Sequence, residues 1–320
     1  MINQLIQKYN LWNENDGCLK STIEKYLERV LNVYNNLFKV EFNPENLELL
    51  LFTSQVLDYI KNQKLSSRIS MLISIISICK KLNRTDISDI YTQIVIPLRK
   101  EQRDFIETNE MTYNEKKNWC TWKDIHKARN LINDQFFTPQ ERIILSFYLD
   151  NIGPRRLSEY RLMKFIIDDD IDIDLTKYEN KDFNFLISNS KFEIRNIIFN
   201  NYKTKKTFGR IIQTNLDEDH TFKIPELLNS TLKNELQFLK NNELIFNHKF
   251  ESNFSLFVKN LFYRITNKKL NINMIRKIFV VDTLTSGNID YKTRKKICDF
   301  LGHSIDTSLL YYNKMVERDG

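Results

Sequence analysis

Residues 301–312 read LGHSIDTSLLYY, so that a histidine is followed nine residues later by a tyrosine. Upstream, residues 273–276 read NMIR and place Arg276 in an otherwise apolar run. An arginine holds phosphate oxygens in a planar fork of donors. A tyrosine hydroxyl can attack phosphorus and keep it as a covalent ester. Arg276, His303 and Tyr312 therefore form a candidate site for phosphate chemistry, which needs a second arginine and a proton donor from elsewhere in the chain.

Two upstream segments offer these groups. Arg155 and Arg156 follow a turn and open a predicted helix, where an arginine readily projects into a cleft; the plainer alternative is a surface arginine paired with Glu159. Lys203 lies in the Lys203-Thr-Lys-Lys206 turn of a β-rich segment, from which a lysine can reach a site by loop movement. Three lysines together are more often a solvated turn. The predicted site therefore depends on where these two segments fold.

The order of these segments resembles that of the tyrosine recombinase, or phage integrase, family. The resemblance covers about residues 118–316. Four short motifs carry it: Arg156-Leu-Ser-Glu159-Tyr160, Lys203-Thr-Lys, Asn273-Met-Ile-Arg276 and Leu301-Gly-His-Ser304 with Tyr312 nine residues after the histidine. Each motif alone is weak, whereas four in the family's order on the expected secondary structure are a strong signal. Spacing selects Arg156 over Arg155, and Tyr312 over Tyr311.

The resemblance implies a mechanism in which DNA strands are cut and rejoined without a metal or other cofactor. Tyr312 would attack the scissile phosphodiester to form a 3′-phosphotyrosine, while Arg156 and Arg276 hold the nonbridging oxygens. His303 would donate a hydrogen bond to the same phosphate or assist proton transfer, and Lys203 would protonate the leaving 5′-oxygen. Glu159 would support the arginine site. Asn273 replaces the family's usual histidine, and an amide cannot become charged.

The predicted fold is mainly α with a small antiparallel β-meander, in the α+β class. Residues 1–105 show helical periodicity with a helix start at Asn43-Pro44, and are assigned as a helical domain like the family's DNA-clamping, core-binding domain. Polar residues 106–118 are assigned as a linker and 119–320 as the catalytic domain. The helix that starts at Asn43-Pro44 is expected to run through Ile60, and a helix over 291–301 is expected to end at Gly302. The helix opened by Arg156 is expected to include Met163 and Phe165, and three strands are expected between 183 and 216.

Composition agrees with a polyanionic partner and gives no sign of a membrane protein. The 320 residues carry a net charge of +7 with a pI near 9.0, and residues 258–296 hold ten Lys/Arg against two Asp. We expect double-stranded DNA as the partner, a homotetramer on paired sites, and neither a membrane nor a small-molecule substrate. The four cysteines (Cys18, Cys79, Cys120, Cys298) are widely spaced, and no signal peptide is evident. These features predict a cytoplasmic or nuclear location and not secretion.

Two alternatives stay open. A type IB DNA topoisomerase uses a similar set of tyrosine, arginine and lysine but relaxes supercoils as a monomer. A DNA-binding accessory protein with a decayed catalytic set would be favoured by Asn273 alone. Within the recombinase alternative, the Lys/Asn/Ile-rich composition suggests the integrase of a mobile element or virus from an AT-rich genome.

Overall fold

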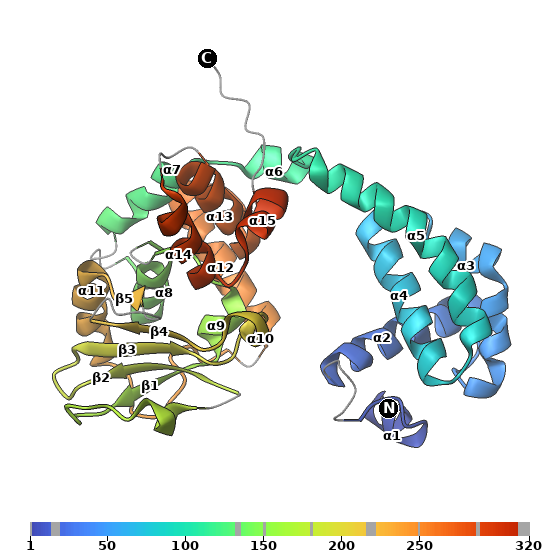
Figure 1. Cartoon of the computed structure of the whole chain (residues 1–320), viewed down its shortest axis with the longest axis horizontal. Coiled ribbons are helices and arrows are strands. Elements are labelled where there is room, and N and C mark those ends of the chain that lie inside the picture. Colours follow the sequence, from blue (N-terminus) through green and yellow to red (C-terminus); the bar gives the residue numbers. More distant parts are fainter. Residues whose placement is uncertain are drawn as a thin grey trace, which may run out of the picture. The chain divides into compact units, whose positions relative to one another are not determined.

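The chain divides into two compact units, Met1–Thr108 and Asn109–Gly320, in a computed structural model (Figure 1). The structure describes residues 2–13, 20–131, 136–149, 152–179, 182–215, 222–248, 250–285 and 289–312. The division falls inside the segment predicted as a linker, which contains the end of one helix and the whole of the short helix α6 (Tyr113–Asn118). Of the four cysteines, Cys18 lies outside the described residues, and the other three are free thiols.

The described residues of the first unit form helices and the loops that connect them, with no strand. Its elements are α1 (Ile2–Lys8), α2 (Lys20–Val33), a π-helical turn η1 (Tyr34–Phe38), a 3-10 helix η2 (Pro44–Leu51), α3 (Thr53–Ile60), α4 (Leu65–Lys81) and α5 (Thr85–Glu107). One apolar core joins them, and buried tyrosine hydroxyls are satisfied inside it, as where Tyr91 donates to the Leu50 carbonyl at 2.7 Å. Asn43 caps η2 as predicted. The helical backbone is interrupted at Phe52, so the single helix expected through Ile60 is divided into η2 and α3.

The second unit combines helices with one sheet. Its helical elements are α6, α7 (Trp122–His126), η3 (Lys127–Leu131), α8 (Pro139–Leu149), α9 (Leu157–Arg161), η4 (Leu175–Tyr178), α10 (Lys205–Phe208), α11 (Glu226–Leu236), α12 (Glu251–Thr266), α13 (Ile272–Phe279), η5 (Val280–Thr285), α14 (Tyr291–Leu301), α15 (Ile305–Thr307) and η6 (Ser308–Tyr312). Its strands are β1 (Met163–Ile167), β2 (Asn184–Ser188), β3 (Ile194–Phe199), β4 (Ile211–Thr214) and β5 (Phe222–Lys223). The predicted α+β class is confirmed.

The sheet is larger than the predicted meander, and it is mixed. Strands β2, β3 and β4 are antiparallel as expected, but β1 pairs parallel with β2 and β5 pairs parallel with β4. The prediction that Met163 and Phe165 lie on a helix is wrong: α9 ends at Arg161, and both side chains are buried in the core from a strand. A short apolar run fits either element, and here strand pairing with β2 decides.

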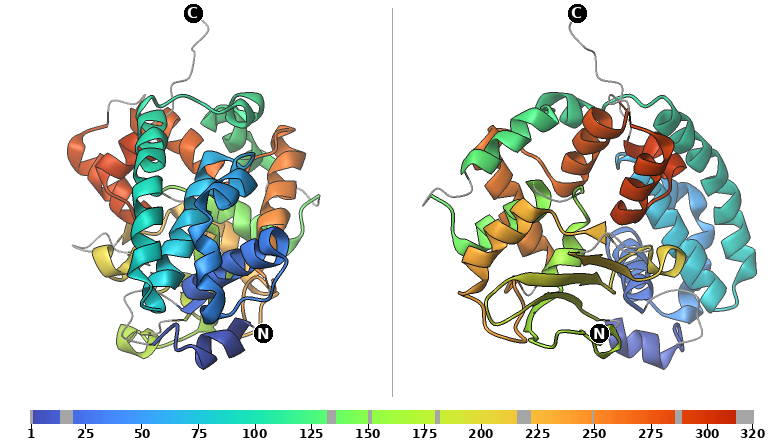
Figure 2. Two further views of the ribbon diagram at one scale, coloured as in Figure 1. Left: turned by 90° about the vertical axis from the view of Figure 1, so that its right-hand side faces the viewer. Right: turned by 60° about the vertical axis from the view of Figure 1, so that its left-hand side comes forward.

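Both faces of the sheet are covered, which fixes its register. Leu186, Ile197 and Phe199 belong to the main core, which lies between the sheet and the α-helices on one side of it in Figures 1 and 2. The alternate residues Phe185 and Ile198 join a small separate cluster on the other face. No helix among the described residues is both long enough and apolar enough to cross a bilayer.

Candidate active site

Arg276 lies on α13 and is almost completely buried, with 1% of its surface exposed. The helix begins where Asn271 caps the Met274 amide, and its inner face consists of buried apolar residues. The guanidinium donates to the Pro154 carbonyl at 2.7 Å and to the Leu301 carbonyl at 3.2 Å. A buried charge costs several kcal/mol unless it is paired or hydrogen-bonded. These bonds hold Arg276 between the turn before α9 and the end of α14.

His303 follows α14 directly and faces Arg276. The helix ends at Gly302, as the sequence predicts, and the His303 Nδ1 atom lies 3.2 Å from an Nη2 of Arg276. Since a guanidinium only donates, Nδ1 accepts this bond and the ring proton is on Nε2. Burial and the charges of Arg276 and Arg156 lower the pKa of His303 to about 3. His303 is therefore neutral near pH 7 and presents Nε2 as a hydrogen-bond donor.

Tyr312 packs against both groups from η6. Its ring centroid lies 5.0 Å from that of His303 and 5.2 Å from the guanidinium carbon of Arg276. Burial raises the pKa of Tyr312, but the charge and hydrogen bonding of Arg276 and the charges of Arg156 and Lys203 outweigh it, so the net pKa is below the usual value of a phenol. The surrounding cations thus favour the phenolate, which is the nucleophilic form.

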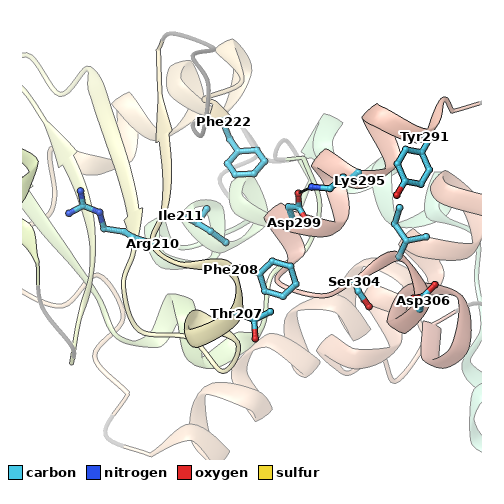
Figure 3. A pocket seen from close by; sticks show the side chains of 11 residues that line it. Thr207, Phe208, Arg210, Ile211, Phe222, Tyr291, Lys295, Asp299, Ser304 and Asp306 are labelled. Carbon is cyan, nitrogen blue, oxygen red and sulfur yellow. Dashed lines mark hydrogen bonds and ion pairs between the residues drawn. The ribbon is translucent and has the colours of Figure 1, made fainter.

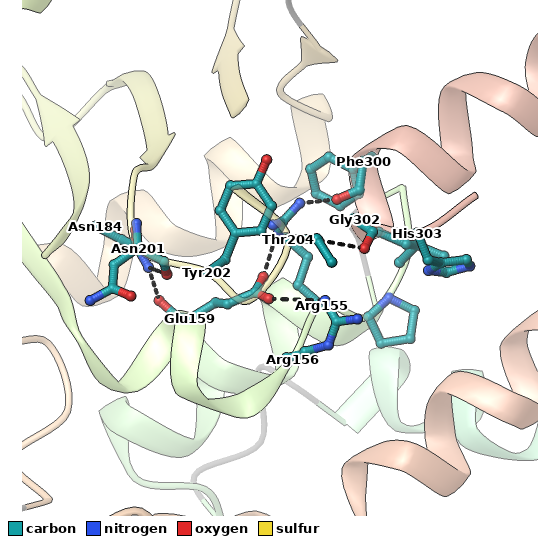
Figure 4. Close-up of polar contacts among 12 residues, drawn as sticks. Arg155, Arg156, Glu159, Asn184, Asn201, Tyr202, Thr204, Phe300, Gly302 and His303 are labelled. Carbon is teal, nitrogen blue, oxygen red and sulfur yellow. Dashed lines mark hydrogen bonds and ion pairs between the residues drawn. The ribbon is translucent and has the colours of Figure 1, made fainter. Parts of the chain in front are cut away.

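The two consecutive arginines before α9 have different environments (Figure 4). Arg155 is completely buried and donates from Nε to Glu159 Oε2 at 2.5 Å, whereas the Arg156 side chain is 21% exposed, with Nη1 3.6 Å from Glu159 Oε1. Burial and the charge of Arg276 lower the pKa of Arg156. Arg156 is therefore the arginine of this pair that borders on Arg276 and can still reach a ligand.

Three donors of this cluster lack a hydrogen-bond partner within the described part of the chain. They are Nη1 of Arg156, Nε of Arg276 and Nε2 of His303, and all three atoms are buried. Buried donors without a hydrogen-bond partner are costly and uncommon in folded proteins. An anion with several acceptor oxygens, such as a phosphate, can accept from several of these donors at once, and the adjacent arginine charges favour it.

The predicted lysine lies on an anchored loop. Lys203 is exposed, and its neighbour Thr204 donates to the Gly302 carbonyl at 2.7 Å, which ties the loop after β3 to the end of α14. The charge of Lys203 acts on Tyr312. Short helix α10, and not a simple turn, follows Lys203. The structure thus brings Arg156, Arg276, His303, Tyr312 and Lys203 into one neighbourhood.

Gly302 is required by both its backbone and its surroundings. Its φ of +70° lies in the left-handed region, and a Cβ would approach Thr204 Oγ1 to 2.9 Å and Arg156 Nη1 to 3.5 Å. We expect Gly302→Ala to destabilise the protein by about 1–2 kcal/mol and to displace His303. Urea denaturation tests this, and Asn267→Ala, at the left-handed C-cap of α12 (φ 52°, ψ 24°), is the control for backbone strain alone. An equal loss in both variants would contradict the role of close packing at Gly302.

Asn273 does not join the cluster. Its side chain is exposed, and with Lys259 and Lys269 it lines a separate polar hollow beside α6. Among the described residues, Asn273 forms no hydrogen bond with Arg276, His303 or Tyr312. Its predicted role at the phosphate therefore stays a prediction without geometric support.

Asn184 is a supporting residue that sequence reasoning missed. From β2 it accepts hydrogen bonds from the amides of Asn200 and Asn201, both at 2.7 Å, and donates to the Glu159 carbonyl at 2.6 Å. It is fully buried and joins α9 to the loop that carries Lys203. The only available signal was a polar side chain opening an otherwise apolar strand, and this pattern does not identify the partner.

A hollow of about 640 Å³ lies next to this loop (Figure 3). Its walls come from α10, β4, β5, α14 and α15, with Phe208, Ile211 and Phe222 on the apolar side. Lys295 and Asp299 form an ion pair of 2.8 Å at its polar side. Tyr312, Arg156 and Arg276 are not among its lining residues, so this hollow is distinct from the arginine cluster.

The neutral state of His303 predicts a pH-dependent stability. An unfolded histidine has a pKa near 6.5, so between that pH and about 3 the unfolded state binds the extra proton and stability falls as pH is lowered. From pH 6.5 to 5 this group should cost about 2 kcal/mol. Denaturation at several pH values should show that the free energy of unfolding falls less steeply with decreasing pH in His303→Gln than in wild type or in His126→Gln. Parallel curves for all three would contradict the buried, neutral state.

Comparison with known proteins gives distant structural likeness only. No family model matches the chain, and no curated protein matches it. A crystal structure of XerA recombinase aligns over 99% of this chain and 95% of its own, at 15% identity and a TM-score of 0.38. The likeness concerns the fold, and at this TM-score it supports no statement about activity.

Proposed function

We propose that this protein is a site-specific DNA recombinase or integrase that cuts and rejoins strands through a 3′-phosphotyrosine. One observation carries the proposal: Tyr312 packs on Arg276 and His303, in the same neighbourhood as Arg156. Its support is the combination of this cluster with the four sequence motifs. Double-stranded DNA is the proposed substrate, and a tetramer on paired sites is part of the proposal.

In the cleavage step, the Tyr312 oxygen bonds to phosphorus as the bond from phosphorus to the 5′-oxygen breaks. Arg156 and Arg276 stabilise the charge on the nonbridging oxygens, and His303 donates from Nε2 to one of them. Because Nδ1 of His303 already accepts from Arg276, the phenol proton passes to solvent and not to this ring. Lys203 gives a proton to the leaving 5′-oxygen. Religation reverses these steps with another 5′-hydroxyl.

Each residue of the cluster contributes by being in place before the charge develops. Removing one such preorganised donor from an anion site costs about 10²–10³ in rate. Glu159 pairs with the arginine before α9, and Asn184 donates a hydrogen bond to the Glu159 carbonyl, which holds the backbone of α9 in place. Asn273 is proposed to contribute only where bound DNA extends to its hollow.

A nicked duplex that loses a short 5′-hydroxyl fragment after cleavage tests the proposal. Wild-type protein should accumulate a covalent protein–DNA adduct that survives denaturing electrophoresis and does not need added metal. Since the DNA site is undetermined, a pool of duplexes from the ends of the encoding element is the substrate. Relaxation of a supercoiled plasmid that lacks any such site would favour the topoisomerase alternative, and binding without any adduct would favour the accessory protein.

A further inference from the structure

Arg155 and Arg156 share one carboxylate unequally. Backbone at Arg156 is extended (φ −70°, ψ 150°), so consecutive side chains point to opposite sides. Arg155 points inward, and its Nε donates a short charge-assisted hydrogen bond to Glu159 Oε2 at 2.5 Å. The Arg156 side chain is 21% exposed, and the 3.6 Å separation of its Nη1 from Glu159 Oε1 is too long for such a bond.

The inward arginine is held by one hydrogen bond to a backbone carbonyl and by three aromatic rings, although its Nη2 atom has no hydrogen-bond partner among the described residues (Figure 4). It donates from Nη1 to the Phe300 carbonyl, and its guanidinium lies over the rings of Phe199 at 4.3 Å, Tyr202 at 4.9 Å and Phe300 at 5.2 Å. Neither Arg155 nor Glu159 is exposed. Arg155 is therefore out of reach of a substrate, and its charge is paired with that of Glu159.

We infer that Arg155 is a positioning residue, which occupies Glu159 so that Arg156 stays available for phosphate. The weak pairing of Arg156 Nη1 with Glu159 Oε1 supports this: they form an ion pair at 3.6 Å, but neither atom has a hydrogen-bond partner among the described residues. Without Arg155, the buried carboxylate has Arg156 as its adjacent cation. Since a buried unpaired charge is strongly unfavourable, Arg156 then turns to Glu159 and leaves the phosphate site.

The test compares Arg155→Met, Glu159→Gln and the double variant Arg155→Met/Glu159→Gln. Methionine keeps the length and apolar contacts of the arginine stem without its charge. Adduct formation on the nicked duplex should fall about 10²–10³-fold in Arg155→Met, as for any lost oxyanion donor. The double variant should regain at least tenfold, because the competing carboxylate is gone. A double variant no faster than Arg155→Met, or an Arg155→Met variant as fast as wild type, would overturn the inference.

A second readout does not depend on cleavage. Inorganic phosphate should raise the melting temperature of wild type and of the double variant, and should raise that of Arg155→Met markedly less. This inference rests on the proposed function for its adduct assay only: if wild type forms no adduct, the proposed function fails, while the phosphate shifts still decide the role of Arg155. If Arg155→Met does not fold, Arg155→Gln with and without Glu159→Gln replaces it, with the same expected and contradicting results.

Discussion

Tyr312→Phe is expected to abolish the covalent adduct while leaving DNA binding within about twofold. The substitution removes one hydroxyl and keeps the ring that packs on His303 and Arg276, so folding should be unaffected. No other group of the cluster can form the phosphoester, because the His303 ring is held by Arg276 and the arginines are not nucleophiles. Denaturing gels measure the adduct, and fluorescence anisotropy measures binding.

Tyr291→Phe is the matched control, because Tyr291 is 72% exposed at the first position of α14 and lines the separate hollow, so this variant is expected to leave the adduct unchanged. Mixing Tyr312→Phe with an arginine variant tests which chain supplies the nucleophile. Since Tyr312 lies against Arg276 of its own chain, the mixture should give no adduct beyond the sum of its components. Restored activity in the mixture would show that the tyrosine acts on the arginines of another subunit.

Arg276→Lys is expected to reduce adduct formation about 10²–10³-fold. Lysine keeps the positive charge but cannot reach Pro154 and Leu301 while also facing a phosphate, because it lacks the planar fork. His303 would lose the donor that fixes its tautomer. The fall in adduct formation should therefore exceed the fall caused by removing one positive charge elsewhere. Single-turnover kinetics at saturating DNA separate this loss from weaker binding.

Arg195→Ala controls for the loss of one positive charge on the same unit. Arg195 lies on β3, and its guanidinium donates to the backbone carbonyl of Asp170. We expect it to cleave within about threefold of wild type. The cost of a surface charge is small and screened by salt. If Arg276→Lys and Arg195→Ala gave the same rate, the buried arginine would have no special part in the chemistry.

Much of the site was predictable because local chemistry determines it. The helix of residues 291–301 has the predicted bounds, since Asp290 caps one end and Gly302 ends the other with a positive φ. Arg276 stood out because a charge in an apolar run must be paired, and the structure supplies its carbonyl partners. Such features depend on a few adjacent residues, and the sequence contains them in full.

What was not predictable depends on distant partners. Met163 and Phe165 form a strand because β2 pairs beside them, although their spacing also suits a helix. Asn273 and Arg276 belong to one motif that was expected at the phosphate, yet Asn273 is exposed and Arg276 is buried, because burial depends on which distant segments pack there. The separate tasks of Arg155 and Arg156 likewise follow from Phe199, Tyr202 and Phe300, which come from other segments.

The central claim is that one phenol of this chain takes up the DNA phosphate. Peptide mapping by mass spectrometry, after nuclease digestion of the trapped adduct, measures this directly. The account predicts a nucleotide attached through its 3′-phosphate to the oxygen of Tyr312. Attachment to any other residue, or wild-type protein that binds the nicked duplex of its own element without forming an adduct, would contradict it.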